Sequence, residues 1–560
     1  MAFLTNIWSR YTDRTADQMK DNVVTNLQSQ VPEITDHSES NLFIKLVNMF
    51  TGLLEGLNYN IDNVGRESHM DSARLYSNVV RLSRSWDYRI SSQQAAQVQL
   101  TISYISTSVL AFPGATIPSG SIVQTANGIQ FVTVEPLVIT SGSFSTAKGQ
   151  VSATNVIAIP YTSLGTSDGT ANQILIVNDK ISGFTATIRV GGIDIYESVE
   201  TFAYSLATDK HFIQTVNEDG EVIIKFGDGT NGIVPTLSDS LEIQYNQTNG
   251  IDGNVLGQTI VQIVGGFPLV SNYTVSVTNL EAAVAGTEVE SAVSIKQNVA
   301  RLFRTRNRAV TELDFVDIAI LEPQVENAGV IFECGKTVNV YIVPIGGGLA
   351  PPSLLADVEA WFNDNRRIIT HRIRAFTAGE IHIKGTIDVT AKSGFDLNQV
   401  QTNVENAWLG YFASTNQQIS GTVRIGDIYE AVEAAEGVDY SVITLLNAEP
   451  YARAIGITNT VLDWDVITNT TSTTQVNWSI LIVGASTYQL LKDSNFVGTF
   501  TIGVQVVQPE ITFTVNASSY SNGDKWTFVS YPYGGNSILL DEPSIPVSDL
   551  TDLILNLNAS

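Results

Sequence analysis

Apolar positions between residues 46 and 64 recur every three or four residues, the spacing of one face of an α-helix. This apolar row consists of Leu46, Phe50, Leu53, Leu57, Ile61 and Val64. A second helix is predicted over about 71–87, and Ser38 or Ser40 could cap the first. The row could pack within a two-helix hairpin of region 1–95. It could equally join a partner's helix, because its 4-3-4 spacing suits a coiled coil.

Residues 96–280 change to strand periodicity. Val98, Leu100 and Ile102 alternate with polar residues, as in a strand with one buried face. Turn signals then recur between short β-branched runs, among them Asn127-Gly128 and Asp219-Gly220. This pattern predicts one all-β domain over 96–280.

Beyond residue 280 helical and strand patterns alternate. Thr311 is a good N-cap for a helix over 312–321, and Ser353 is expected to cap the next helix. Apolar residues from Leu397 to Phe412 predict a further helix, while 451–560 returns to strand signals. The sequence thus predicts a multidomain α+β protein. Its parts are an N-terminal helical region (1–95), an all-β domain (96–280), two small α+β domains (281–374 and 375–450) and a C-terminal β domain (451–560).

Composition narrows the possible partners. The chain has 560 residues and a formal net charge of −26, which disfavours binding to nucleic acid and to anionic membranes. It contains one cysteine, Cys334, so neither an internal disulfide nor a Cys-rich zinc site is expected. Basic residues gather near Arg304 and Arg308, where they could meet an acidic face of a neighbour or form local salt bridges.

A search for catalytic motifs is mostly negative. Residues 165–169 match the GxSxG motif by letters, with Ser167 as the nucleophile, but they are interpreted as a loop. The sequence contains no HExxH motif, Walker loop or GxGxxG motif, and its acidic loops lack EF-hand spacing. We therefore expect no enzymatic activity, no cofactor and no required metal.

The segment 226–255 is the most informative one. It reads as a strand, a glycine turn, a second strand and a second glycine turn, with Gly229 and Gly253 expected to need turn conformations that strain other residues. Its marked positions are Phe226, Gly227, Asp228, Gly229, Gly232, Pro235, Tyr245, Gly250, Gly253 and Asn254.

This segment resembles the baseplate J-like family, the wedge proteins of contractile-tailed phages and related injection machines. The family pattern has FGDG, a glycine and a proline, a strand that ends in Tyr, and a TxGxxGNV turn. Three further segments resemble it in the same order: 117–131, the RAVT-to-DF segment 308–315, and 423–438. The resemblance covers about residues 30–450.

The resemblance implies a structural protein of the virion, made in the host cytoplasm. Such wedge proteins are expected to pair within each wedge and to form a ring around the central hub, beside other wedge and sheath-proximal proteins. The ring is expected to transmit the trigger for sheath contraction. One alternative is a receptor- or carbohydrate-binding tail protein, with exposed aromatics among Trp464, Trp478, Tyr531 and Tyr533. The other is a tail-associated hydrolase with a carboxylate pair.

Overall fold

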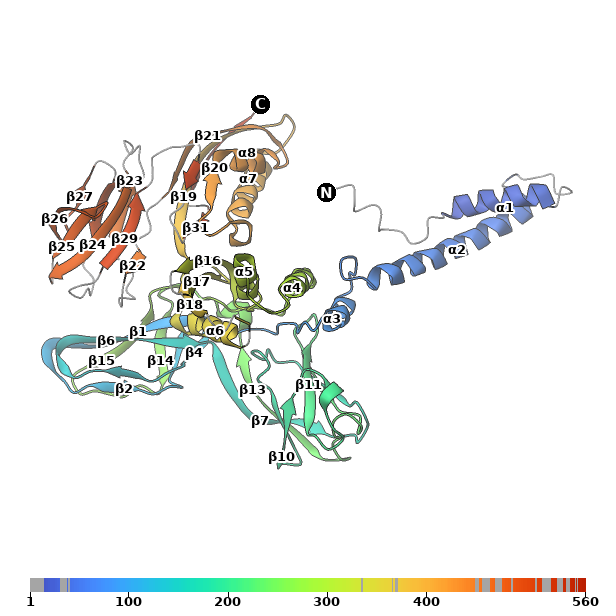
Figure 1. Cartoon of the computed structure of the whole chain (residues 1–560), viewed down its shortest axis with the longest axis horizontal. Helices are drawn as coiled ribbons and strands as arrows, with labels where there is room; N and C mark the ends of the chain where they lie inside the picture. Colours follow the sequence, from blue (N-terminus) through green and yellow to red (C-terminus); the bar gives the residue numbers. More distant parts are fainter. Residues whose placement is uncertain are drawn as a thin grey trace. The chain divides into compact units, whose positions relative to one another are not determined.

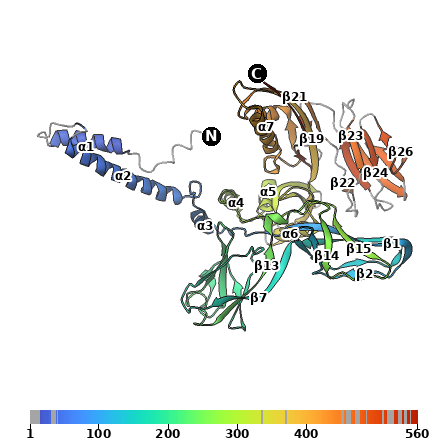
Figure 2. The ribbon, with the colours of Figure 1, turned by 180° about the vertical axis from the view of Figure 1, so that it is seen from behind.

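The computed structural model describes residues 15–30, 38, 41–333, 336–364, 366–367 and 371–448, together with parts of 453–559. Those later parts are 453–455, 464–468, 476–484, 487–508, 511–515, 525–530, 537–539, 544–548, 550 and 552–559. The fold is multidomain α+β, as predicted (Figures 1 and 2). It divides into two compact units: the first is 1–93, 158–247 and 288–306, and the second is 94–157, 248–287 and 307–560. Cys334 lies outside the described residues.

The first unit begins with helices α1 (Ala16–Gln30), α2 (Leu42–Glu67) and α3 (Tyr76–Arg84). Helices α1 and α2 lie side by side (Figure 1). Asn41 caps α2, because its side chain accepts a hydrogen bond from the Phe43 N–H. The prediction that Ser38 caps this helix was therefore wrong, because Ser38 lies too far before the helix start. The other predicted cap, Ser40, is outside the described residues.

The sheet of the first unit has seven strands in the order β7-β13-β9-β10-β11-β12-β8. Neighbouring strands whose register is known are antiparallel except β10 and β11. The strands are β7 (Val156–Thr166), β8 (Ile174–Val177), β9 (Thr187–Val190), β10 (Asp194–Ser198), β11 (His211–Val216), β12 (Val222–Phe226) and β13 (Ser240–Thr248). Helix α4 (Ala292–Thr305) completes this unit, and the short helix η1 (Phe202–Tyr204) lies between β10 and β11.

The second unit opens with a six-stranded sheet in the order β14-β3-β4-β6-β1-β15. Its strands are β1 (Gln97–Phe112), β3 (Ile122–Thr125), β4 (Gln130–Thr133), β6 (Gly142–Thr154), β14 (Ile260–Gly265) and β15 (Thr274–Asn279). Two short strands, β2 (Ala115–Ile117) and β5 (Leu137–Ile139), pair with each other, and the short helix η2 (Gly250–Gly253) precedes β14. The range 96–280, expected to be one β domain, thus forms two sheets in different units. Turn spacing marks where strands end, but it does not specify which strands pair. The local sequence therefore gives no signal that 158–247 is inserted as a separate sheet.

Two α+β layers follow. In the first, α5 (Glu312–Ile320) and α6 (Pro352–Asn363) pack against strands β16 (Val325–Glu333), β17 (Thr337–Pro344) and β18 (Arg372–Thr377) around a core that includes Phe315 and Phe362. Thr311 caps α5 as predicted, in a reciprocal capping box with Asp314. Ser353 does not cap α6, because the helix already starts at Pro352, where proline is well tolerated.

The second layer places α7 (Leu397–Phe412) and α8 (Ile425–Glu433) on strands β19 (Gly379–Ala391) and β21 (Val438–Ala448). The short elements η3 (Ser414–Asn416) and β20 (Thr422–Arg424) connect the helices.

Strands from the end of the chain complete this layer. β31 (Ser544–Val547) and β32 (Leu553–Ala559) run parallel to β19, and β30 (Ser537–Leu539) pairs with β20. Residues 451–560 therefore do not form one separate domain, because their last strands belong to the sheet of 375–450.

The remaining C-terminal strands form two sheets with one core. Their orders are β22-β29-β24-β25-β26 and β23-β28-β27. The strands are β22 (Arg453–Ile455), β23 (Trp464–Thr468), β24 (Val476–Gly484), β25 (Thr487–Lys492), β26 (Asn495–Thr501), β27 (Val506–Val507), β28 (Ile511–Val515) and β29 (Lys525–Ser530). These strands form where the sequence returns to strand signals.

Candidate assembly surface

The predicted apolar row of α2 is exposed. Leu53 and Leu57 are 62% and 58% exposed, and Leu46, Phe50, Ile61 and Val64 are exposed as well. The buried side chains in the first half of α2 are instead Ile44, Val47 and Thr51. The row therefore does not pack inside the α1–α2 hairpin, and a contiguous exposed apolar surface of this kind is typical of an interface.

A carboxylate joins α2 to α3. Glu67, the last residue of α2, accepts hydrogen bonds from the Arg74 and Leu75 N–H groups at 2.9 and 3.2 Å and from Asn78 Nδ2 at 2.9 Å. Leu75, the N-cap of α3, has no capping side chain, so Glu67 supplies the acceptor that the helix start requires. The Asn78 hydrogen bond, followed by the two N–H groups, lowers the pKa of Glu67.

Another carboxylate, which is buried, connects the segment after α3 with α4. Glu290, 9% exposed, accepts from Tyr88 Oη at 2.8 Å with both its oxygens and from Asn298 Nδ2 at 2.8 Å. Lys296 Nζ of α4 donates to the Ala73 carbonyl at 2.6 Å. These contacts fix α3 on α4 within the first unit. Neither Glu67 nor Glu290 was predicted from the sequence. An acidic residue before a helix with an apolar N-cap is a usable signal for Glu67, but the Tyr88 partner of Glu290 is 202 residues away and gives no local signal.

The two arginines expected at an interface are both exposed. Arg304 lies in the last turn of α4 and Arg308 lies just before α5. Their predicted contact with a neighbour remains a prediction.

The FGDG turn has a geometry that requires its glycines. Phe226 is fully buried, and a Cβ at Gly227 would lie 2.3 Å from the Gly232 carbonyl oxygen. Gly229 and Gly232 have φ of +87° and +82°. Asp228 Oδ1 accepts from the Asn231 and Thr230 N–H groups at 2.7 and 2.8 Å, which lowers the pKa of Asp228. The turn is thus built for shape, with its carboxylate used by the backbone.

The other marked positions also serve packing. The Pro235 carbonyl accepts from Ser167 Oγ, and Tyr245 Oη donates to Asp179. Gly250 has φ of +58°, but Gly253 does not have a positive φ, so the expectation of turn strain at Gly253 was wrong. Gly253 is required for space instead, because a Cβ would lie 3.0 Å from both Ala96 and Asn155.

Asn254 connects the second glycine turn to a distant strand connection. Its Nδ2 donates to the Gly286 carbonyl at 2.9 Å, and its Oδ1 accepts from the Gly286 N–H at 2.8 Å. The Asn254 side chain therefore makes the two hydrogen bonds to the Gly286 backbone that a neighbouring strand would otherwise make.

The GxSxG residues form no nucleophile site. Ser167 is buried, and its hydroxyl lies 3.1 Å from two acceptors, Gln173 Oε1 and the Pro235 carbonyl. The first two residues of the motif end strand β7, and Ser167 to Gly169 lie in a loop as expected, with a turn rather than a helix after them. Across the described residues, no three His, Cys, Asp or Glu side chains form a group that could hold a metal ion. None of the described helices is long and apolar enough to cross a membrane.

The aromatic residues weighed for carbohydrate binding do not form an exposed platform where they are described. Trp478 is 1% exposed and lies in the core of the C-terminal sheets. Tyr531, Tyr533 and the side chain of Trp464 lie outside the described residues.

Comparisons with known proteins give matches only among solved structures. No family model and no curated protein matches the chain. Among solved structures, the chain is similar to a protein in the cryo-EM structure of the anti-feeding prophage baseplate, with 11% sequence identity and a TM-score of 0.27. The match covers 76% of this chain and 86% of that one.

Proposed function

We propose that this chain is a structural wedge protein in the baseplate of a contractile tail. It forms a ring around the central hub with other copies of itself and with other wedge proteins, and it passes the trigger for contraction toward the sheath. The exposed apolar row of α2 is the observation that carries the proposal, because a helix that leaves Leu53 and Leu57 in water needs a partner to cover them.

The roles of the family-like residues support a structural function. Gly227 and Gly232 allow a close backbone approach, Asn254 connects two loops, and Thr311 with Asp314 caps a helix. Each of these residues fixes the geometry of a loop or of a helix start. A protein that transmits movement depends on such fixed connections between elements more than on reactive side chains.

The proposed role requires neither catalysis nor a cofactor. Ser167, the one nucleophile that a motif singles out, is buried with its hydroxyl already hydrogen bonded. Cell-wall clearing by the purified chain that is lost in Ser167→Ala, or stoichiometric zinc or iron in the purified protein, would contradict this part.

The net charge of −26 disfavours nucleic acid and anionic membranes as partners. Phosphate backbones and anionic lipid surfaces repel a chain of this charge, whereas basic faces of neighbouring tail proteins attract it. We place neither nucleic acid nor membrane among its partners.

Assembly of tail particles with and without this chain tests the proposed function. Particles that lack it are expected to have no complete baseplate ring and no triggered contraction, and the full-length chain supplied in trans should restore both. Complete, contractile baseplates in its absence would overturn the proposal.

A further inference from the structure

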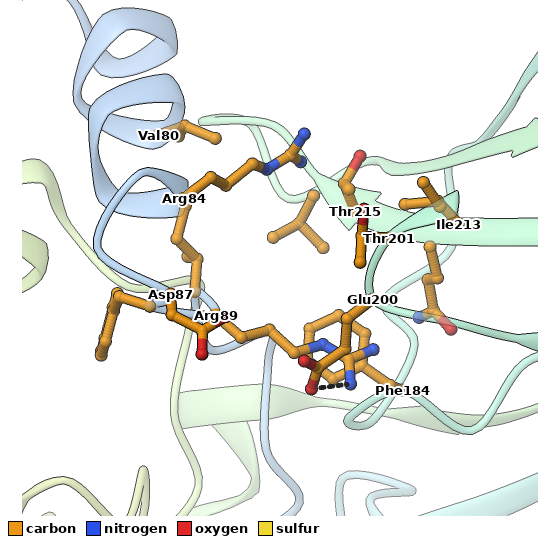
Figure 3. Close-up of a pocket in the computed structure, with 13 residues that line it drawn as sticks. Val80, Arg84, Asp87, Arg89, Phe184, Glu200, Thr201, Ile213 and Thr215 are labelled. Atoms are coloured by element: carbon orange, nitrogen blue, oxygen red, sulfur yellow. Dashed lines mark hydrogen bonds and ion pairs between the residues drawn. The ribbon is translucent and has the colours of Figure 1, made fainter. Parts of the chain in front are cut away.

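Helix α3 lies beside a cavity of about 310 Å³ that is lined by residues of α3 and of strand β11 (Figure 3). Arg84 of α3 extends across this cavity toward Thr215 of β11 (Figure 3). Arg89, which follows α3, lines the same cavity and pairs with Glu200 at 3.3 Å. These arginines therefore lie on the cavity side of α3, and a different set of residues lies where α3 meets α4.

An exposed aromatic pair joins the ends of α3 and α4. Trp86 follows α3 and Phe303 lies in the last turn of α4, with their ring centroids 5.0 Å apart and their ring planes at 81°. The two residues are 48% and 59% exposed. Covering such aromatic surface is favourable, and aromatic residues are enriched in the buried cores of protein interfaces. The pair therefore forms the apolar part of a candidate docking surface.

Basic residues are concentrated on the two segments that carry this pair. Residues 76–86 and 291–306 contain six basic residues and no acidic one, whereas the whole chain has a net charge of −26. Of the acidic residues that flank these segments, Glu290 is buried and already accepts hydrogen bonds from Tyr88 and Asn298, and Asp87 is exposed. The two helices are therefore a locally cationic region of an acidic protein, which favours an acidic partner.

Two of these basic residues lie close enough to repel each other. Arg301 and Arg304 are one turn apart on α4, and Arg301, which is half-buried, donates to Asn298 Oδ1 at 2.7 Å. Burial lowers the pKa of Arg301, and the like charge of Arg304 lowers it further. A carboxylate bound near both guanidinium groups would relieve this repulsion. Phe303 directly precedes Arg304, so a partner that covers the aromatic pair also approaches this charge.

We propose that Trp86, Phe303, Arg301 and Arg304 form a docking surface for an acidic segment of a partner protein, in which a large apolar side chain lies next to carboxylates. The apolar side chain would cover the aromatic pair, and the carboxylates would pair with the two arginines. Arginine suits this role because its planar guanidinium group forms two parallel hydrogen bonds with a carboxylate. A protein segment is favoured over nucleic acid, because the net charge of −26 repels a phosphate backbone. The inference does not depend on the proposed tail function.

Calorimetric titration of the full chain with a model peptide tests the proposal. The probe is Gly-Asp-Glu-Leu-Phe-Glu-Asp-Gly, acetylated and amidated so that its ends carry no charge. Its matched control replaces each acidic residue with the corresponding amide, and a second control replaces Leu and Phe with Ser. The acidic apolar peptide should bind saturably at low salt, and each control should bind about fivefold more weakly or worse, because it lacks one of the two recognised features.

Variants of the chain locate the binding surface. Phe303→Ala and Arg304→Gln should each weaken binding of the acidic peptide about fivefold or more, because covered apolar area or a charge-assisted hydrogen bond is lost. Both side chains are exposed, so the midpoint of thermal unfolding should stay that of wild type. Arg84→Gln is the matched control, since it removes the same charge from the cavity side of α3, and it should change the affinity less than about twofold.

Several results would overturn the proposal. These are equal binding of the acidic peptide and either control peptide, unchanged affinity in Phe303→Ala or Arg304→Gln, and an equal loss of affinity in Arg84→Gln. No saturable binding of the acidic peptide at millimolar concentration would also overturn it. A short single-stranded oligonucleotide that binds more tightly than the acidic peptide, with the same dependence on Arg304, would show that the surface recognises nucleic acid instead.

Discussion

Introducing charge into the apolar row of α2 should block assembly without unfolding the chain. The variant is Leu53→Asp with Leu57→Asp. Both side chains are exposed, so the substitutions remove no core contact. The cost to the helix is about 0.5 kcal/mol at each site, from the lower helix propensity of aspartate. The hairpin should remain folded, because its buried residues, such as Ile44 and Val47, are unchanged.

The cost at the interface is much larger. Complete burial of a leucine side chain contributes about 1.5–3 kcal/mol. Leu53 and Leu57 still expose 62% and 58%, so covering them would contribute about 1–2 kcal/mol each. Losing both is worth about 2–4 kcal/mol, or about 30- to 900-fold in affinity. The desolvation of two carboxylates increases this loss further.

Competition between differently tagged chains measures the effect. Wild type and variant are co-expressed during assembly, and their ratio is measured in purified particles. We expect the double variant to be nearly excluded. Asn22→Asp with Asn26→Asp in α1 is the matched control, because it adds the same charge at exposed polar positions and should be incorporated like wild type. Equal incorporation of the Leu53/Leu57 variant, with a folded hairpin by circular dichroism, would refute the reasoning.

Three further predictions concern stability in the full chain. Gly227→Ala should lower the midpoint of thermal unfolding by several degrees, because its Cβ would lie 2.3 Å from the Gly232 carbonyl oxygen. Gly265→Ala, with open space around the new Cβ, should leave the midpoint unchanged. Equal midpoints of the two variants would contradict the close approach of Gly227 and Gly232. The lowered pKa of Glu67 means that its contribution is present above the unfolded pKa of about 4.5 and is lost as pH falls, so protection of the Arg74 amide from hydrogen exchange should fall below that pH. In Glu67→Gln the protection should be low and independent of pH, and wild-type protection that does not depend on pH would contradict this role of Glu67. Burial, reinforced by Asp357, raises the pKa of Glu322 to about 8, so the native state loses stability as pH rises from about 4.5 to 8, and Glu322→Gln should raise the midpoint more at pH 8 than at pH 5; a gain that is equal at both pH values would exclude an ionisable buried carboxyl.

Local patterns predicted the elements well because the responsible forces are local. The apolar row of α2 and the Thr311 cap depend on residues three or four apart, and both were predicted correctly. The Ser353 cap was wrong because proline at the preceding position already starts the helix.

Pairing across long separations could not be predicted in the same way. The sheet of 158–247 is inserted between strands of another sheet, and β32 returns to β19 from more than 160 residues away. The Tyr88–Glu290 contact spans 202 residues. No periodicity encodes such contacts, since they depend on the packing of whole layers.

The sequence predicted which residues form the candidate surface, but not that this surface is exposed. Spacing identified the apolar row, but it could not show whether the hairpin buried it, because that depends on which face α1 covers. The cavity beside α3 gave no signal at all, since its lining comes from segments that are far apart in the sequence.

High-resolution electron cryo-microscopy of the assembled tail tests the central claim most directly. The account predicts that the chain lies in the baseplate, with a helix of a neighbouring subunit packed on α2 at the usual interaxial distance of about 8–10 Å and in contact with Leu53 and Leu57. A map in which this row of α2 faces solvent, or in which the chain lies outside the baseplate, would contradict it.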